Sequence, residues 1–215
     1  MIHWRVKKFL AFNFPMAYAL VINRGLPPVG LHDGLWLAEL WDNPKWEWPL
    51  KNELLKSLTR PTDRILDLGT GTGGILRFLQ QHGYGKLAAA DSADYPVRRL
   101  RGIGIDARQG VLPDIPFEDG SFDFVIASQV LEHIVQRRRF MREIRRVLAP
   151  GGHLAVFVPD WCLSPADEPS HVAVYRKNTL SRFLSRYFLV EDVRSIRDPN
   201  HGVDTLFALA SKRAT

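Results

Sequence analysis

The chain of 215 residues contains a single cysteine, Cys162. One cysteine cannot form an intrachain disulfide, which excludes a small domain held together by disulfide bridges. The sequence also has no uninterrupted apolar run near the roughly 20 residues that a membrane-spanning helix needs, and it has no internal repeat or low-complexity tract. These absences exclude a disulfide scaffold, a helical membrane protein and a repeat architecture.

The composition is that of a globular domain, because 46% of the residues are hydrophobic and 24% are charged. The 29 Lys and Arg residues outnumber the 23 Asp and Glu residues, which gives a formal net charge of +6. A positive excess favours anionic partners such as phosphates, nucleic acid or an acidic membrane surface.

The N-terminal segment weakly resembles a secretory signal peptide, since Lys7 and Lys8 precede the apolar stretch 9–22. Asn13 and Pro15 interrupt that stretch. We therefore expect a cytoplasmic protein.

Residues 1–58 differ in composition from the rest of the chain. They contain five of the six tryptophans, namely Trp4, Trp36, Trp41, Trp46 and Trp48. These aromatic residues either pack onto the main domain or form a lid that closes over an acceptor and excludes water. We favour the lid, and predict an N-terminal cap over 1–58 and a second unit over 59–215. The basic, aromatic N-terminus also predicts a weak association with membrane surfaces.

From residue 64 onward, short apolar runs alternate with amphipathic stretches. Strands are predicted at 64–68, 86–90, 104–108, 122–128 and 153–158, and helices at 74–82 and 132–148. A break at 150–152 precedes the fifth strand. This alternation indicates an α/β fold with a parallel sheet covered on both faces. A further helix at 178–187 and strands at 190–196 and 205–210 predict a terminal hairpin, joined by a turn at 198–202, and hence one antiparallel strand.

A glycine-rich loop follows the first of these strands. Gly69, Gly71 and Gly74 satisfy the dinucleotide pattern G-x-G-x-x-G, and Asp91 lies at a distance suited to binding a ribose. However, Asp67 precedes the loop, and its carboxylate would oppose a pyrophosphate at the helix N-terminus. A cofactor with a cationic end, such as S-adenosylmethionine, would be favoured by that carboxylate.

Four motifs in register then resemble one family, the class I S-adenosylmethionine-dependent methyltransferases of the small-molecule, methyltransferase-11-like type. They are the glycine loop 65–74 and the segments 116–125, 128–133 and 146–152. The resemblance runs from about 64 to 213. It implies a Rossmann-like, doubly wound sheet of seven strands, six parallel and one antiparallel.

The resemblance also implies that S-adenosyl-L-methionine is the cofactor and S-adenosyl-L-homocysteine the product. The loop would surround the methionine end, Asp91 would bind the ribose and Ser92 would flank the adenine. The implied cofactor-binding residues are Asp67, Gly69, Thr70, Gly71, Gly73, Asp91, Ser92, Val111, Leu112, Ser128 and Gln129.

Adenine recognition departs from the family pattern. The family often has an acid after the third strand, where this chain has Gly110, Val111 or Leu112. Either backbone and apolar groups recognise the adenine, or the nearby Asp114 does.

Transfer of a methyl group from a sulfonium is an in-line displacement, so the protein mainly aligns the reactants. A hydroxyl acceptor also needs a general base, for which histidine is suited near neutral pH. His133 is the first candidate because it follows the strand 122–128, and His171 and Tyr175 come next, in the segment that lines the acceptor pocket in the family. The alternatives are that His133 caps or packs the following helix and that His171 and Tyr175 contact solvent. Asp160 and Glu132 are weaker candidates.

Two further classes of site are not expected. No Asn/Asp-Pro-Pro-Tyr motif follows the strand 122–128, which argues against methylation of the exocyclic amines of bases. We also expect no metal, because the acids are scattered and no Cys/His ligand spacing is present.

Six arginines lie on the predicted helix 132–148, namely Arg137, Arg138, Arg139, Arg142, Arg145 and Arg146. They form either a nucleic-acid surface or the solvated outer face of a helix that covers the sheet. We favour the solvated face and expect no nucleic acid partner.

The predicted function is methyl transfer to a small-molecule acceptor, most plausibly at oxygen, with a sugar, a lipid-linked quinol or a secondary metabolite as acceptor. The alternatives are an NAD-dependent oxidoreductase on a similar sheet and a non-catalytic, nucleic-acid-binding or protein-binding member of the fold. The sequence predicts no particular oligomeric state.

Overall fold

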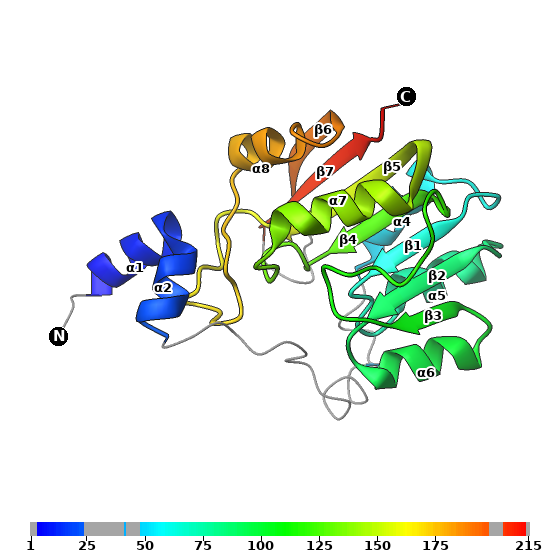
Figure 1. Ribbon diagram of the computed structural model, residues 1–215, viewed down its shortest axis with the longest axis horizontal. Coiled ribbons are helices and arrows are strands. Elements are labelled where there is room, and N and C mark those ends of the chain that lie inside the picture. Colours follow the sequence, from blue (N-terminus) through cyan, green and yellow to red (C-terminus); the bar gives the residue numbers. More distant parts are fainter. Residues whose placement is uncertain (1–3, 24–40, 42–47, 198–203, 214–215) are drawn as a thin grey trace.

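The computed structural model describes residues 4–23, 41, 48–197 and 204–213. Its centre is a seven-stranded sheet with the strand order β3-β2-β1-β4-β5-β7-β6 (Figure 1). β7 pairs antiparallel with both β5 and β6, whereas the other pairings are parallel, so the predicted fold is confirmed. The strands are β1 Ile65–Leu68, β2 Leu87–Asp91, β3 Asp106–Gln109, β4 Phe122–Ser128, β5 Leu148–Pro159, β6 Leu189–Arg197 and β7 Asp204–Ser211. The predicted hairpin turn at 198–202 lies outside the described residues, as do Trp36 and Trp46.

Helices cover both faces of this sheet. One face carries α4 (Pro49–Leu58), α5 (Gly74–Gln81) and α6 (Asp94–Gly102), and the other carries α7 (Arg137–Val147) and α8 (Lys177–Leu184). Alternate residues of β4 separate the two cores: Val125 packs with the α7 side, and Phe124 and Ile126 pack with the α5 side. This alternation explains the apolar run 124–127 within the strand, since both of its faces are buried there.

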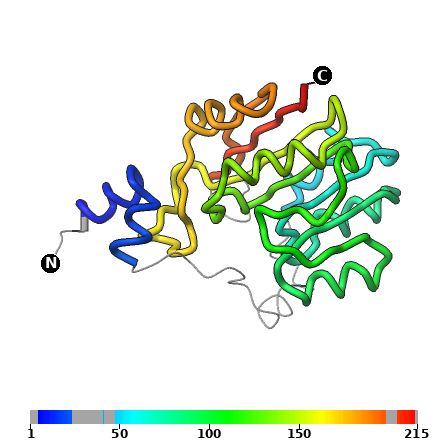
Figure 2. The backbone as a smooth tube through the Cα atoms, in the orientation of Figure 1, coloured from blue at the N-terminus to red at the C-terminus, as the bar shows by residue number. Residues whose placement is uncertain are grey.

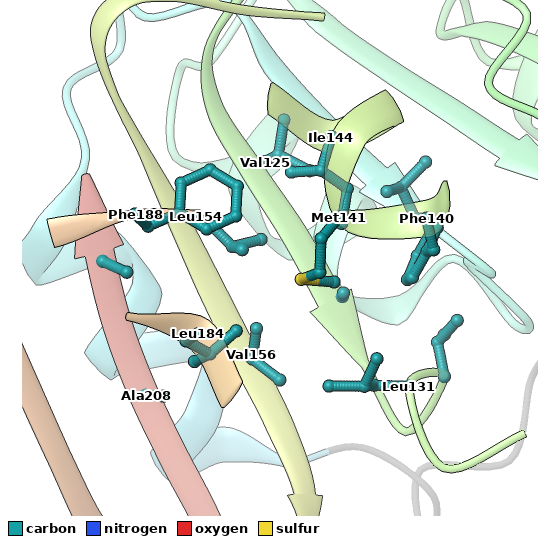
Figure 3. Packing of buried hydrophobic residues seen from close by; sticks show 14 of the residues in the cluster. Val125, Leu131, Phe140, Met141, Ile144, Leu154, Val156, Leu184, Phe188 and Ala208 are labelled. Carbon is teal, nitrogen blue, oxygen red and sulfur yellow. The ribbon is translucent and has the colours of Figure 1, made fainter. Parts of the chain in front are cut away.

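Apolar residues at helical spacing attach α7 to the sheet. Phe140, Met141 and Ile144 are fully buried in the cluster that also contains Val125 and Leu154, and Ile144 lies beside Val125 (Figure 3). The arginines of the same helix occupy its other positions, and its apolar stripe therefore explains both its formation and its orientation.

The predicted helix 132–148 begins later than expected, at Arg137. Gln129 has a positive φ of 56°, which turns the chain directly after β4. The carbonyl of Glu132 then accepts hydrogen bonds from the amides of Val172 and Ala173, at 2.8 and 3.2 Å. Because that carbonyl is engaged with a distant segment, it is not in a helical turn, and residues 129–136 form turns instead.

Two strand boundaries also differ from the prediction. The expected break at 150–152 lies inside β5, which begins at Leu148 and pairs there with Phe122 before the register shifts. Gly151 has a φ of 74° and bonds to Lys212, so β5 continues through the irregularity beside the C-terminal strand. β3 runs over Asp106–Gln109 and is largely exposed, which explains its weak apolar signal.

The first two helices, α1 (Trp4–Asn13) and α2 (Pro15–Val21), lie against the segment that follows β5 (Figure 2). The rings of Phe12 and Trp161 are 4.9 Å apart, and Asn23 donates a hydrogen bond to the carbonyl of Pro165. By contrast, α4 belongs to the core of the sheet, where its Leu55 is fully buried. Among the described residues, no helix is both long and apolar enough to cross a membrane.

Candidate active site

The glycine loop connects β1 to α5 and contains three left-handed residues, Gly69, Gly71 and Gly73, with φ between 54° and 68°. A Cβ at Gly69 would lie 2.6 Å from Val130, and one at Gly73 would lie 2.7 Å from Leu100. The protein's own packing therefore requires these two glycines. A Cβ at Gly71 would meet no heavy atom of the described chain within 4 Å. The middle of the loop thus faces open space, as expected where backbone approaches a ligand.

Asp67 lies at the end of β1 and is only 2% exposed. Its carboxylate accepts a hydrogen bond from the hydroxyl of Thr70 at 2.9 Å. Burial raises the pKa of Asp67 to about 7, although Thr70 and the nearby charge of Lys51 act in the opposite direction. A buried carboxylate with such a pKa favours a cationic ligand, because a positive charge would stabilise its ionised form.

Asp91 ends the neighbouring strand β2 and is held by the loop. One of its oxygens accepts the amide of Gly71 at 3.0 Å, and the other accepts the amide of Ala93 at 2.9 Å. These contacts fix the orientation of the Asp91 carboxylate beside Gly71. The structure therefore brings together the residues predicted for the methionine end and for the ribose.

A small cavity of about 80 Å³ lies beside the loop. Its lining includes the predicted residues Asp67, Gly69, Thr70 and Ser128. The other lining residues were not among the predicted cofactor-binding residues; they are Trp48, Lys51, Asn52, Thr72, Gly74 and Ile75.

Lys51 is the most consequential of the residues that were missed. Its Nζ atom donates a hydrogen bond to Ser128 Oγ at 3.0 Å and lies 4.7 Å from the centre of the Trp48 ring. It thereby connects α4 to the end of β4. The sequence carries no motif for this contact, because 77 residues separate the two partners.

Ser92 and the end of β3 border the predicted adenine side. The side chain of Gln109 donates to the carbonyl of Ser92 at 3.0 Å, and the amide of Gly110 donates to the carbonyl of Asp91 at 2.9 Å. These bonds hold the loops after β2 and β3 together.

The other residues predicted to contact the adenine follow β3 along the chain. Val111 is half exposed, and Leu112 is partly buried against the core. Asp114 forms an ion pair with Arg139. The structure therefore engages Asp114 with α7, which favours backbone and apolar contacts for adenine over a carboxylate.

A cluster of polar side chains lies just beyond β4. The rings of His133 and His171 are 4.8 Å apart and nearly perpendicular. His133 Nδ1 lies 3.2 Å from the carbonyl of Ser170, and His171 Nδ1 lies 2.8 Å from that of Leu163. Because a carbonyl only accepts, each Nδ1 carries a proton.

One of the structural alternatives for these residues is wrong. His133 lies in the turns before α7, which begins at Arg137, whereas the alternative for the other two residues is contradicted by their burial. His171 and Tyr175 are each only 4% exposed and therefore do not form a solvated loop. Burial lowers the pKa of His171, and burial raises the pKa of Tyr175 to about 12, so the phenol keeps its proton near neutral pH.

Glu132 completes this cluster. It is 1% exposed, and neither of its carboxylate oxygens has a hydrogen-bond partner among the described residues. Burial raises its pKa to about 8. The ligand atoms of Glu132, His133 and His171 all lie within 4.8 Å of one another. Their proximity could not be predicted from the sequence, because His171 is far from the other two residues along the chain.

The arginine cluster is confirmed on α7, and its members partly pair with acids. Arg146 bonds to Glu143 at 2.8 Å and to Asp119 at 2.9 Å, and Arg139 pairs with Asp114. Such pairs favour the interpretation of this surface as a solvated helix face.

The family described as "Methyltransferase domain" matches residues 66–156, which include the glycine loop, both aspartates and His133. Sterol 24-C-methyltransferase of Schizosaccharomyces pombe is 31% identical over 126 residues, 55% of this chain and 32% of the relative. Tocopherol O-methyltransferase of Arabidopsis thaliana is 29% identical over 139 residues, 59% of this chain and 38% of the relative.

A third relative, sarcosine/dimethylglycine N-methyltransferase of Halorhodospira halochloris, is 34% identical over 112 residues, 46% of this chain and 40% of the relative. The matches to these three curated relatives span about a third to two fifths of the relatives' own lengths.

Solved structures share the fold. An S-adenosylmethionine-dependent methyltransferase from Aquifex aeolicus superimposes with a TM-score of 0.64 at 22% identity, over 84% of this chain and 99% of that one. The 1,6-didemethyltoxoflavin-N1-methyltransferase of Burkholderia thailandensis, solved with its acceptor and S-adenosylhomocysteine, gives a TM-score of 0.62 at 18% identity, over 83% and 81%. Residues 66–156 therefore match the methyltransferase-domain family, and the glycine loop and the seven-stranded sheet show the fold of the S-adenosylmethionine-dependent methyltransferases.

Proposed function

We propose that this protein transfers a methyl group from S-adenosylmethionine to a small-molecule acceptor, and that the methylated atom is an oxygen. The observation that carries the proposal is the open space at Gly71, with the buried Asp67 on one side and the oriented Asp91 on the other.

The residues around this space fit the donor. S-adenosylmethionine has a cationic amino group and a sulfonium, which the Asp67 carboxylate would stabilise, and a ribose diol, which Asp91 would accept bonds from. When bound, it supplies a methyl group on a positively charged sulfur. A nicotinamide dinucleotide fits less well, because the Asp67 carboxylate would oppose its pyrophosphate.

The proposal that the methylated atom is an oxygen rests on the residues on the acceptor side. The relatives named above methylate at carbon, oxygen and nitrogen according to their names, so family membership leaves the atom open. In this chain His133 and His171 lie just beyond β4, at the sheet edge where ligands of open α/β folds bind. Imidazoles in that position promote the loss of a hydroxyl proton, with His133 as the first choice of base. A sugar, a lipid-linked quinol or a secondary metabolite supplies such a hydroxyl.

Weak association with an anionic membrane surface belongs to the same proposal. α1 and α2 expose Val6, Phe9, Phe14, Leu20 and Val21, and Lys7 and Lys8 lie on the same segment. Apolar side chains next to lysines favour the boundary of an acidic bilayer.

The experiment is a methyl-transfer assay over a panel of phenols, quinols and sugars, with product identified by mass spectrometry. We expect His133→Ala and His171→Ala to lower kcat by about 10²–10⁴-fold and to leave S-adenosylmethionine affinity nearly intact, because the glycine loop is untouched. The matched control is His82→Ala, an exposed histidine at the end of α5. Wild-type rates in both cluster variants would contradict a role for the histidines.

A further inference from the structure

We propose that Glu132, His133 and His171 bind one divalent transition-metal ion. The three residues come from two segments, the turn after β4 and the segment after β5, and their ligand atoms lie within 4.8 Å of one another.

The donor set is suited to such an ion. Two imidazoles and one carboxylate are the protein ligands of catalytic zinc sites that keep a fourth position open. With ligand atoms about 2.1 Å from zinc, two of them lie roughly 3.4 Å apart in a tetrahedral site, so closure needs movements on the order of 1 Å. Nitrogen and oxygen donors favour Zn²⁺ and its first-row neighbours over ions that prefer thiolates. Cys162, the only thiol of the chain, bonds to the carbonyl of Asp204.

The two imidazoles are already oriented as ligands. Each Nδ1 donates its proton to a backbone carbonyl, that of Ser170 for His133 and that of Leu163 for His171. This tautomer presents Nε2 as the nitrogen with a lone pair for a metal. Histidine ligands in metalloproteins are commonly oriented by such a bond from the other ring nitrogen.

Glu132 supplies the second, independent observation. Its carboxylate is almost fully buried, and neither oxygen accepts a hydrogen bond from the described residues. A buried polar group without a partner is costly. A cation between Glu132 and the two histidines would compensate the cost of burying this carboxylate.

The backbone holds the cluster together without an ion. The carbonyl of Glu132 accepts the amides of Val172 and Ala173, which ties the turn after β4 to the segment that carries His171. The ligands therefore need side-chain adjustment only, with no rearrangement of the fold.

This site deepens the proposed function, because with the ion bound His133 and His171 would promote deprotonation through the ion and not as bases themselves. The cluster lies four residues beyond Ser128, which lines the cavity beside the glycine loop. An acceptor hydroxyl at the open position of the ion would lose its proton to water more easily. Its oxygen would then form a bond to the methyl carbon as the bond from that carbon to the donor's sulfur breaks. This consequence rests on the proposed methyl transfer, whereas metal binding itself does not.

The test is the metal stoichiometry of the full, tag-free chain, without cofactor or acceptor. After treatment with a chelator, the chain is dialysed against micromolar Zn²⁺ and analysed for zinc. Co²⁺ loading followed by visible absorption reports the geometry. We expect one equivalent per chain in the wild type, and affinity lower by at least about 100-fold in Glu132→Gln and His171→Ala.

His82→Ala serves as the control and should bind as the wild type does, and circular dichroism shows whether each variant is folded. The proposal is overturned if the wild-type chain retains no stoichiometric zinc, a result that needs no variant. Equal binding by the folded Glu132→Gln and His171→Ala chains would overturn it as well. Because no methyl transfer is measured, failure here is distinct from failure of the proposed function.

Discussion

Two carboxylates at the ends of neighbouring strands differ in their surroundings. Asp91 accepts two backbone amides and is held in place by them. Asp67 is buried, and burial raises its pKa to about 7. A ligand with a positive charge would stabilise the ionised Asp67 carboxylate and so offset the cost of its burial. Asp67 therefore discriminates between cofactors better than the glycine pattern does.

The pKa of Asp67 predicts how stability depends on pH. The ordinary value is 3.8, so between about pH 4 and 7 the folded, ligand-free chain holds a proton that the unfolded chain has released. The contribution of Asp67 to the free energy of unfolding therefore falls as pH rises through this window, by up to about 4 kcal/mol. Asp67→Asn should remove this part of the pH dependence and stabilise the ligand-free chain at pH 8. Urea denaturation of both chains at pH 4 and pH 8 measures it, and equal pH dependence in the two would contradict it.

Gly71 can be compared with Gly83, which ends the turn after α5. Both have a positive φ, and a Cβ at either position would meet no described atom within 4 Å. Gly71→Ala and Gly83→Ala should therefore lose a similar amount of stability, about 1 kcal/mol. Only Gly71→Ala should weaken S-adenosylhomocysteine binding, because only that Cβ enters the ligand's space. Calorimetry measures the S-adenosylhomocysteine affinity of both variants. Unchanged binding in Gly71→Ala would mean that the loop does not contact the cofactor.

At the scale of elements, the apolar strands and the glycine loop were predictable because their signals are local. β1 and β4 are buried on both faces over most of their length and are largely apolar. The start of α7 was not predictable, since the hydrogen bonds that engage the carbonyl of Glu132 come from Val172 and Ala173. Likewise, the role of α4 depends on Lys51 reaching Ser128, a contact between distant segments that leaves no pattern in the sequence.

The helices α1 and α2 lead to a prediction of their own. They contact the segment after β5 through Phe12 and Trp161, and none of their described residues lines the cavity beside the glycine loop. Deletion of residues 1–23 should therefore reduce acceptor turnover and binding to anionic vesicles, while S-adenosylhomocysteine affinity stays close to that of the full chain. Vesicle sedimentation and calorimetry on the same folded product test this. Equal loss of turnover and cofactor affinity would show that the two helices are structural.

At the scale of the molecule, the strand order explains why distant motifs meet. β1 lies between β2 and β4 in the sheet, and the three strands are parallel. Their carboxyl ends bring Asp67, Asp91 and Ser128 to one edge, where the chain reverses its direction of winding and open α/β folds bind ligands. The resemblance to a family predicted this arrangement, and the residues alone predicted only its parts.

The same topology brings the cluster of His133 and His171 close to that edge. From the sequence, only His133 could be predicted at the edge directly, because it follows the strand 122–128. The packing of His171 against His133 depends on the course of the segment after β5. Local sequence carries no information on that course. The acceptor site was therefore less predictable than the cofactor site.

The most direct test of the account is a calorimetric titration of the full chain with S-adenosylmethionine and, separately, with NAD. We expect S-adenosylmethionine to bind and NAD to show no comparable binding. Asp91→Ala should weaken S-adenosylmethionine binding by roughly 1–3 kcal/mol, whereas Asp94→Ala, which removes an exposed acid paired with Arg98, should not. Binding of NAD in place of S-adenosylmethionine, or unchanged affinity in Asp91→Ala, would contradict the assignment of the site.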